Sequence, residues 1–236
     1  MNAPPLGVIT TDMVVKNINC LPRPSGIIGD LLRCMDDENA GAAALANVVA
    51  RDQVLVARLL RIANSPFYGL RGQVESIPSA IAVLGLRTVH GLATATAFCG
   101  TFAAINSTEF SVETYARHSL STALCSRSLA RRMKIGEGGA FVAGLLHDIG
   151  RLMFACAFPE HLALAANYRL ENECANHEAE LVTAGIDHGL IGGILGERWH
   201  FPPAICAAIA NHHRPDDHDQ GALACAVHLG DVLAHA

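Results

Sequence analysis

The sequence predicts an all-α protein. Of its 236 residues, 51% are hydrophobic and only 5% aromatic, and the apolar residues are mostly Ala, Leu, Ile and Val. Ala and Leu are strong helix formers, and Leu55, Leu59 and Ile62 recur at helical spacing. No segment alternates polar and apolar residues as a half-buried strand does. A chain of this length forms one large domain or two small ones.

The expected helices follow one another between caps and breakers. Asp52 can cap a helix that begins at Val54, Pro78 fits the first turn of another, and Ser111 can cap a long one. Residues 1–20 look irregular or weakly helical, and the polar segment 105–111 is the expected boundary between two halves. We expect helices over 26–36, 41–51, 54–63, 78–85, 86–104, 112–133, 137–148, 159–175, 177–184, 187–199, 202–212 and 221–235.

Glycines recur at spacings of three and four residues at the start of the last quarter of the chain. Each interior helical glycine costs about 1 kcal/mol relative to alanine, so several on one face indicate a close approach to that backbone. A second helix is favoured over a bound ligand as the group that packs closely against this backbone. The glycines are Gly185, Gly189, Gly192, Gly193 and Gly196.

Composition and charge argue against several classes of function. The net charge is −5 and no basic patch stands out, so we expect no direct nucleic-acid binding. The N-terminus has no secretory pattern. Residues 88–108 lack Asp, Glu, Lys and Arg, but their polar residues indicate a soluble helix and no membrane span. The eight cysteines form no C-x-x-C pair, which favours reduced thiols and a cytoplasmic protein.

The segment Gly144–Gly150 ends an apolar run with His147 and Asp148 side by side. Burial of such a pair without partners would be costly, whereas imidazole and carboxylate together bind a divalent cation well. Of the 12 histidines, all but His90 lie at or after residue 118. The second half of the chain is therefore the expected location of a metal site.

Seven residues from five expected helices are candidate ligands of one metal centre, as in helical bundles whose side chains project inward. Considered alone, His118 and His188 are better explained as surface, cap or core histidines than as metal ligands. For each of the other five candidates, a structural role and a role as ligand are about equally favoured. Their order and residue types together favour a site. The candidates are His118, His147, Asp148, His188, His212, His213 and Asp231.

The other histidines of the second half are interpreted as surface, cap or core residues: His161, His177, His200, His218, His228 and His235. Because His228 lies three residues before Asp231 on the same helix face, it is also a candidate to support that residue. Because imidazole-rich sites suit transition metals and calcium prefers oxygen ligands, we expect one or two ions of iron, manganese, zinc or nickel.

The order of these ligands resembles the HD superfamily of metal-dependent phosphohydrolases, and the surrounding sequence resembles its HDOD branch, the HD-related output domains of bacterial signalling proteins. The matching segments are Leu21–Pro24, Leu59–Gly69, Ser76–Gly85, Ala143–Gly150, Trp199–Ile205 and Asn211–His213. The resemblance implies a single HDOD domain over 15–236, with an N-terminal helical lobe over 15–108 and an HD-like lobe over 109–236. It also implies a signalling role, often through protein contacts.

The ligand set also resembles the HD-GYP branch, which hydrolyses cyclic di-GMP. Two departures argue against that activity. Arg151 stands where that branch has lysine, and Arg214-Pro215-Asp216-Asp217 follows His213 in place of the Glu and Gly-Tyr-Pro motif. Arginine still binds phosphate bidentately, so Arg151 is a candidate phosphate-binding residue.

Two hypotheses from different classes follow. In the first, the chain is a signalling output domain with a retained metal site that contacts a sensor, a kinase or a component of a cyclic-dinucleotide pathway. In the second, it is a metal-dependent phosphohydrolase acting on a phosphoester or a nucleotide. Asp148 is then the candidate catalytic residue, and His147 and Asp148 lie at a centre shared by two ions. The aromatic turn Asn64–Gly69 is an expected partner surface, unless its rings pack inward.

Overall fold

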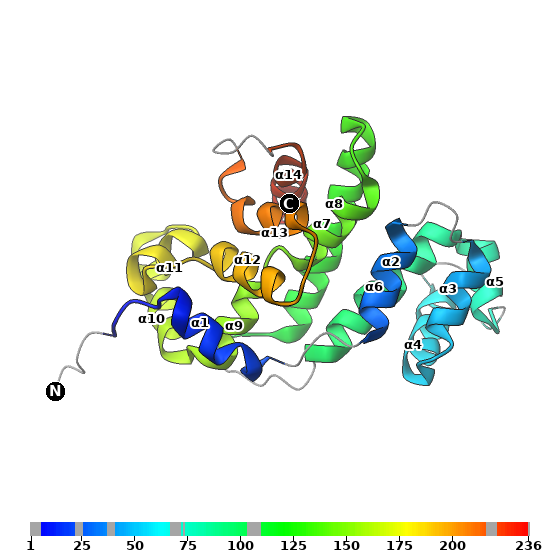
Figure 1. Cartoon of the computed structure of the whole chain (residues 1–236), viewed down its shortest axis with the longest axis horizontal. Helices are drawn as coiled ribbons and strands as arrows, with labels where there is room; N and C mark the ends of the chain where they lie inside the picture. The colour runs from blue at the N-terminus through cyan, green and yellow to red at the C-terminus, as the bar shows by residue number, and fades with distance from the viewer. Residues whose placement is uncertain are drawn as a thin grey trace. The chain divides into compact units, whose positions relative to one another are not determined.

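The computed structural model describes residues 6–21, 26–36, 41–66, 72, 74–102, 110–215 and 221–235. Every regular element in these ranges is a helix, so the all-α prediction is confirmed (Figure 1). The chain forms two compact units. The small unit is Pro24–Ala103, and the large unit combines Met1–Arg23 with Ala104–Ala236.

The small unit contains five helices among its described residues: α2 (Gly26–Asp36), α3 (Ala42–Val49), α4 (Gln53–Ala63), α5 (Ile77–Leu84) and α6 (Leu86–Phe102). Asp52 caps α4 as expected, because its Oδ1 accepts the Leu55 N–H at 3.0 Å. The core of the unit includes Leu31, Val49 and Leu59. His90 is buried and donates from Nε2 to the Leu31 carbonyl at 2.7 Å, so this histidine is structural.

The aromatic turn expected as a partner surface belongs to the small unit, but Phe67, Tyr68 and Gly69 lie outside the described residues. The cap residues Asn64 and Ser65 are described, and the Asn64 side chain exchanges hydrogen bonds with the backbone of Val74. The segment Pro22–Ser25 also lies outside the described residues.

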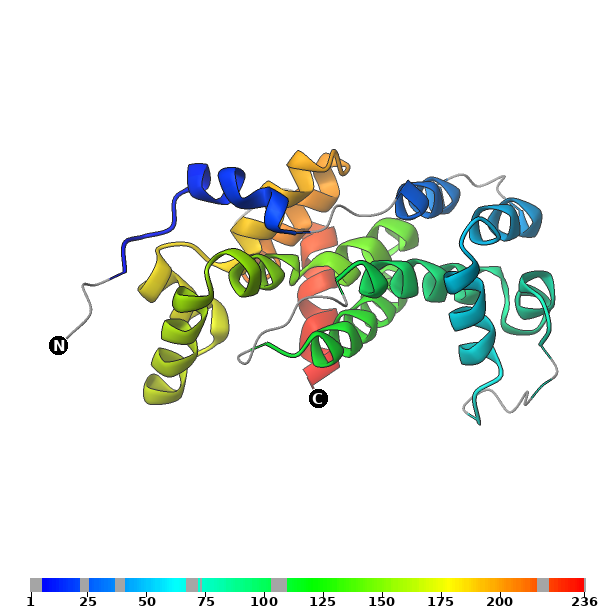
Figure 2. The same ribbon diagram turned by 90° about the horizontal axis from the view of Figure 1, so that it is seen from below.

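The large unit contains the candidate ligands. Its described helices are α1 (Thr11–Asn17), the 3₁₀ helix η1 (Ile18–Cys20), α7 (Val112–Met133), α8 (Glu137–Leu146), α9 (Ile149–Ala157), α10 (Pro159–Asn172), α11 (Asn176–Ala184), α12 (His188–Arg198), α13 (Pro203–Asn211) and α14 (Gly221–His235). α7 packs along α8 and α14, and α12 packs against α9 and α13 (Figures 1 and 2).

The first described residues fold with the large unit, although the sequence suggests weak structure there and places the chain from residue 15 in the first lobe. Val14 of α1 is fully buried. The Ile9 N–H donates to the Ala184 carbonyl, and His161 Nε2 donates to the Gly7 carbonyl, both at 2.8 Å. These long-range contacts explain the difference, because local sequence alone does not reveal them.

The helix expected over 137–148 ends at Leu146, and a further helix that the sequence analysis missed, α9, begins at Ile149. By length and apolar composition alone, Glu137–Ala157 could span a membrane, but 83% of its most apolar window is buried inside the molecule. The stretch is a bent core segment. His147 and Asp148 lie at the bend, where the two helices meet.

Close packing against α13 accounts for four of the five recurring glycines, as expected, whereas Gly185 ends α11 in a left-handed conformation with a φ of 74°. A Cβ at Gly193 would lie 2.9 Å from the Ala210 side chain of α13, and one at Gly192 would lie 2.7 Å from Ile209. A Cβ at Gly150 of α9 would come within 2.0 Å of the His188 carbonyl oxygen. Glycine at position 150 therefore lets α9 and the start of α12 approach closely enough to bring Asp148 and His188 together.

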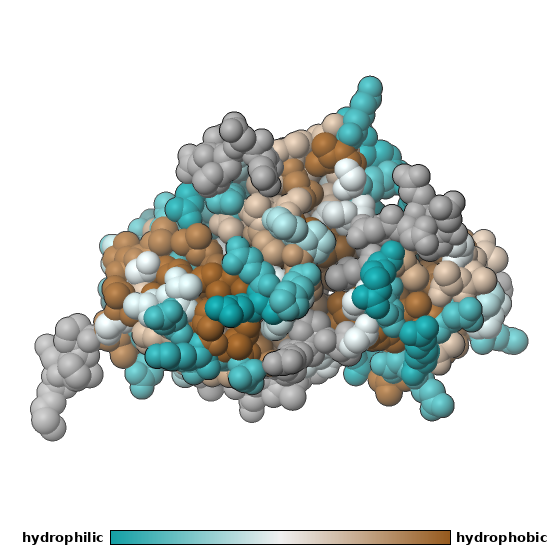
Figure 3. All heavy atoms as spheres, viewed as in Figure 1, coloured by the Kyte–Doolittle hydropathy of each residue, from teal (hydrophilic) through white to brown (hydrophobic). Residues whose placement is uncertain are grey.

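On the face seen in Figure 3, hydrophobic residues gather over the part of the large unit that includes α11. Val182 of α11 and Leu170 of α10 are each more than 60% exposed. Exposed apolar clusters of this kind are common at protein interfaces.

Candidate metal centre

His147 and Asp148 are buried at the junction of α8 and α9, with exposures of 0% and 5%. The His147 Nδ1 lies 2.8 Å from the Gly144 carbonyl oxygen. A carbonyl oxygen only accepts, so Nδ1 carries the hydrogen and Nε2 is left to accept, donate or bind a metal. The local helix end thus fixes the orientation of this ring before any ligand arrives.

The rings of His212 and His188 are also held by hydrogen bonds from Nδ1. His212 Nδ1 lies 2.7 Å from the Ile209 carbonyl oxygen, and His188 Nδ1 lies 2.6 Å from Glu180 Oε2. All three histidines therefore use Nδ1 for a supporting hydrogen bond and present Nε2 to the interior of the site. Metal-binding histidines are held in this way by carbonyls and carboxylates.

Asp148 is the acceptor on which these rings converge. Its Oδ1 lies 3.0 Å from His188 Nε2, 3.6 Å from His147 Nε2 and 4.0 Å from His212 Nε2. The His212 Nε2 is buried and has no hydrogen-bond partner among the described residues. Neutral Nε2 lone pairs facing a carboxylate repel it, so the arrangement requires protons or a metal cation between them.

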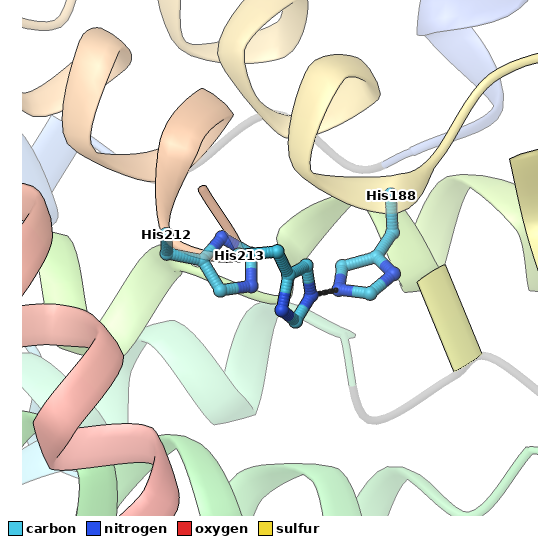
Figure 4. Close-up of side chains that lie close together, drawn as sticks. All are labelled: His188, His212 and His213. Atoms are coloured by element: carbon cyan, nitrogen blue, oxygen red, sulfur yellow. Dashed lines mark hydrogen bonds between the residues drawn. The ribbon is translucent and has the colours of Figure 1, made fainter. Parts of the chain in front are cut away.

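The remaining candidates form two groups on either side of Asp148. In the first, His118 Nε2 lies 2.9 Å from Asp231 Oδ1 and 3.2 Å from His147 Nε2. In the second, His213 Nε2 lies 2.8 Å from His188 Nε2, with His212 beside them (Figure 4). The structure therefore brings all seven candidate residues into one site.

Buried charges dominate the electrostatics of the site. Burial opposes protonation of His188, but Glu180 and Asp148 outweigh burial and raise the pKa of His188 to about 10. Burial and the neighbouring His147 and His188 lower the pKa of His212 to about 3. Burial works against charge on Asp148, yet His147, His188 and Arg151 hold the pKa of its carboxyl well below the ordinary value. Burial also opposes protonation of His147, but Asp148 and Asp231 outweigh it and raise the pKa of that ring, so the carboxylates favour the protonated form of both His147 and His188.

Three further residues support the ligands, of which His228 was a candidate from the sequence, whereas Glu180 and His177 could not be recognised there. Glu180 is 2% exposed and accepts both the ring N–H and the backbone N–H of His188. It lies in an ordinary polar stretch of α11, and only its burial distinguishes it. The His177 ring stacks on His213 with centroids 4.0 Å apart, and His228 Nδ1 donates to the His212 carbonyl at 2.8 Å.

Arg151 lies beside Asp148, in the first turn of α9. Its Nη1 is 3.2 Å from Asp148 Oδ2, and its guanidinium lies 5.9 Å from the centroid of the Phe110 ring. Its Nε is buried and has no hydrogen-bond partner among the described residues. This N–H is thus not used by the described residues, and guanidinium N–H groups are good donors to phosphate.

The donor set fits a divalent metal. Four groups of three side chains have ligand atoms within 4.8 Å of one another, and three of these groups lie among the seven candidates: His188–His212–His213, His118–His147–Asp148 and His147–His212–Asp231. Imidazole nitrogens and carboxylate oxygens from separate helices are the ligands that transition metals prefer in helical bundles. The identification of these residues as ligands stays a prediction.

Comparison with known proteins identifies the family to which the chain belongs. The HDOD domain family matches residues 21–215, so the chain belongs to the HDOD-domain family. The resemblance found in the sequence is therefore confirmed.

Solved structures share the fold over almost the whole chain. An HDOD domain protein of unknown function from Geobacter sulfurreducens is 25% identical with a TM-score of 0.83, covering 94% of this chain and 76% of its own. A protein from Shewanella amazonensis SB2B, named provisionally as a phosphohydrolase, is 26% identical with a TM-score of 0.77, covering 94% and 80%.

Other relatives are longer than this chain. A Marinobacter aquaeolei VT8 protein, named provisionally as a signal transduction protein, is 26% identical with a TM-score of 0.78, covering 95% of this chain and 51% of its own. An uncharacterized protein of Treponema pallidum (strain Nichols) is 23% identical over 204 residues, 85% of this chain. The chain spans 39% of the length of that curated relative.

Proposed function

We propose that the chain is an HDOD-type signalling domain that retains a binding site for a divalent transition metal. The observation that carries the proposal is the shared orientation of His147, His188 and His212. Each ring is held through Nδ1, so that its Nε2 faces Asp148 within 4.0 Å. A structural role would not require three buried rings to direct Nε2 at one carboxylate, whereas a metal site does.

The ligand chemistry narrows the choice of metal. Five imidazoles and two carboxylates favour iron, manganese, zinc or nickel over calcium, which prefers an all-oxygen shell. Asp148 lies between the two groups of ligands, so it is the natural residue to be shared if two ions bind. His118 and Asp231 would then serve one ion, and His188, His212 and His213 the other.

Metal analysis tests the site directly. Full-length protein purified without chelator should contain a first-row transition metal, and the double variant His147→Ala/Asp148→Ala should contain none. The exposed His200 lies outside both ligand groups, so His200→Ala is a matched control and should keep the metal. Full occupancy in the double variant would show that these residues are not the ligands.

The signalling role is supported by family membership and by the name of the Marinobacter relative. We infer that the domain acts mainly through contacts with signalling proteins, such as a sensor, a kinase or a component of a cyclic-dinucleotide pathway, in the cytoplasm. A nucleotide is the candidate small ligand. The net charge of −5 argues against a phosphate backbone as the partner.

A second candidate function, phosphoester hydrolysis, is favoured by Arg151 and by the name of the Shewanella relative. A bound metal would supply an activated water and stabilise negative charge on a phosphoryl oxygen. The chain's own contribution would be positional. Asp148 would hold its ligand partners in place, and Arg151, fixed by Asp148 at 3.2 Å, would orient a phosphate through its Nε edge.

A further inference from the structure

One histidine outside the seven candidates, His235, lies against the first ligand group. Its ring centroid is 4.4 Å from that of His118, and its Nδ1 is 3.3 Å from Asp231 Oδ1. One ligand atom from each of His118, Asp231 and His235 lies within 4.8 Å of the other two. The sequence alone favours a surface, cap or core role for His235, so this histidine is an addition to the seven candidate metal ligands.

The hydrogen bonding of His235 repeats that of the buried candidates. His147 and His212 each follow the last residue of a helix and donate from Nδ1 to the carbonyl three residues earlier. His235 is the last residue of α14, and its Nδ1 lies 3.0 Å from the Asp231 carbonyl, four residues earlier. Because that oxygen only accepts, Nδ1 carries the hydrogen and Nε2 keeps its lone pair.

Exposure distinguishes His235 from the other residues of its group. Its side chain is 66% exposed, whereas the side chains of His118 and Asp231 are each 14% exposed. His235 therefore stands on the solvent side of the first group, at the end of a helix, while the other ligands approach from the interior.

We propose that His235 is an additional ligand, through Nε2, of the ion that His118 and Asp231 would hold. The inference rests on the proposed metal site. His235 would then be the most exposed of the three residues that hold this ion. Imidazole at this position also makes the first group richer in nitrogen, which favours zinc, nickel or iron over manganese.

The competing explanation is that His235 only caps α14, because a histidine at a helix C-terminus interacts favourably with the last carbonyls. His235→Asn separates the two roles. Its side-chain amide can still donate to the Asp231 carbonyl, but it lacks Nε2. His200→Asn is the matched control, because His200 is exposed and lies in neither ligand group.

The experiment titrates the metal-free full chain with Co²⁺ and follows two readouts, calorimetry for affinity and visible d–d absorption for the ligand set. We expect His235→Asn to weaken binding of one Co²⁺ by about tenfold to a hundredfold and to shift the absorption bands. His200→Asn should match the wild type in both readouts. Thermal unfolding of the metal-free variants should be unchanged.

Wild-type affinity and an unchanged spectrum in His235→Asn would overturn the inference. If His147→Ala abolishes binding in the same series, the metal site itself stands and only the role of His235 is refuted. If the wild type binds no Co²⁺, the proposed metal site fails, and the inference about His235 fails with it.

Discussion

Replacing Gly150 with alanine should damage both the fold and the metal site. Gly150 is the second residue of α9, and a Cβ there would lie 2.0 Å from the His188 carbonyl oxygen, 2.8 Å from its carbonyl carbon and 2.9 Å from its Cα. These are backbone atoms at the start of α12, so no change of rotamer relieves the contact. The two helices would have to separate by about 1 Å to reach the 3.0 Å that real contacts respect.

The cost of that separation is at the upper end of the range for overpacked cores, about 3 kcal/mol. The metal site should suffer as well, because Asp148 and His188 lie on the two elements that move apart. Their contact of 3.0 Å would lengthen, and the lost geometry should weaken metal binding. Urea denaturation of the metal-free protein and calorimetric titration with Co²⁺ measure the two effects separately.

Gly139→Ala is the matched control. Gly139 lies in α8, and a Cβ there meets nothing within 4 Å, so alanine should stabilise the protein by up to about 1 kcal/mol through helix propensity. If Gly150→Ala unfolds at the wild-type urea concentration and binds Co²⁺ with wild-type affinity, the close approach of α9 and α12 does not hold the site together.

Four further predictions concern the charges and the chemistry of the site. Glu180→Gln should lower Co²⁺ affinity by about tenfold or more, because it weakens the support of His188, and equal titration curves for variant and wild type would contradict this. The folded-state pKa of His188 is raised from 6.5 to about 10. The pairing of His188 should therefore stabilise the metal-free protein fully below pH 6.5, and this stabilisation should be lost as the pH rises toward 10. Co²⁺ affinity should rise over the same interval because protons no longer compete for the ring, and urea midpoints that do not fall with pH would count against this reasoning. When the protein is loaded with manganese or iron, any hydrolysis of cyclic di-GMP should be slow beside that of a generic phosphodiester. Arg151→Gln should weaken phosphate binding. Rapid turnover of cyclic di-GMP that is lost in His147→Ala would instead show that the main function of the protein is enzymatic.

The sequence was sufficient for the fold class and for the residues that meet in the site. Helical spacing, caps such as Asp52 and the His147–Asp148 pair are local patterns, and local patterns can be recognised in one sequence. The family resemblance supplied the order in which distant ligands come together. The structure then added the orientation of each ring, which depends on carbonyls such as those of Gly144 and Ile209.

What the sequence did not reveal depends on contacts between distant segments. Glu180 looks like an ordinary polar residue until α11 is packed against His188. His235 looks like a helix-end residue until α14 is packed along α7, which carries His118. The break between α8 and α9 falls at His147 and Asp148, between two apolar stretches. Asp148 is the N-cap residue of α9, but its side chain makes no capping hydrogen bond, and no proline marks the break.

The position of Met1–Arg23 in the large unit has a consequence for synthesis of the protein. The ribosome completes the small unit, Pro24–Ala103, before any of Ala104–Ala236 exists, and domains generally fold as they emerge. The first segment must therefore wait, with the apolar side chains of Val14 and Leu21 uncovered, until α9, α10 and α12 are made. A chain shortened to begin at Ala104 would contain all seven candidate ligands but would leave uncovered the surface on which α1 rests.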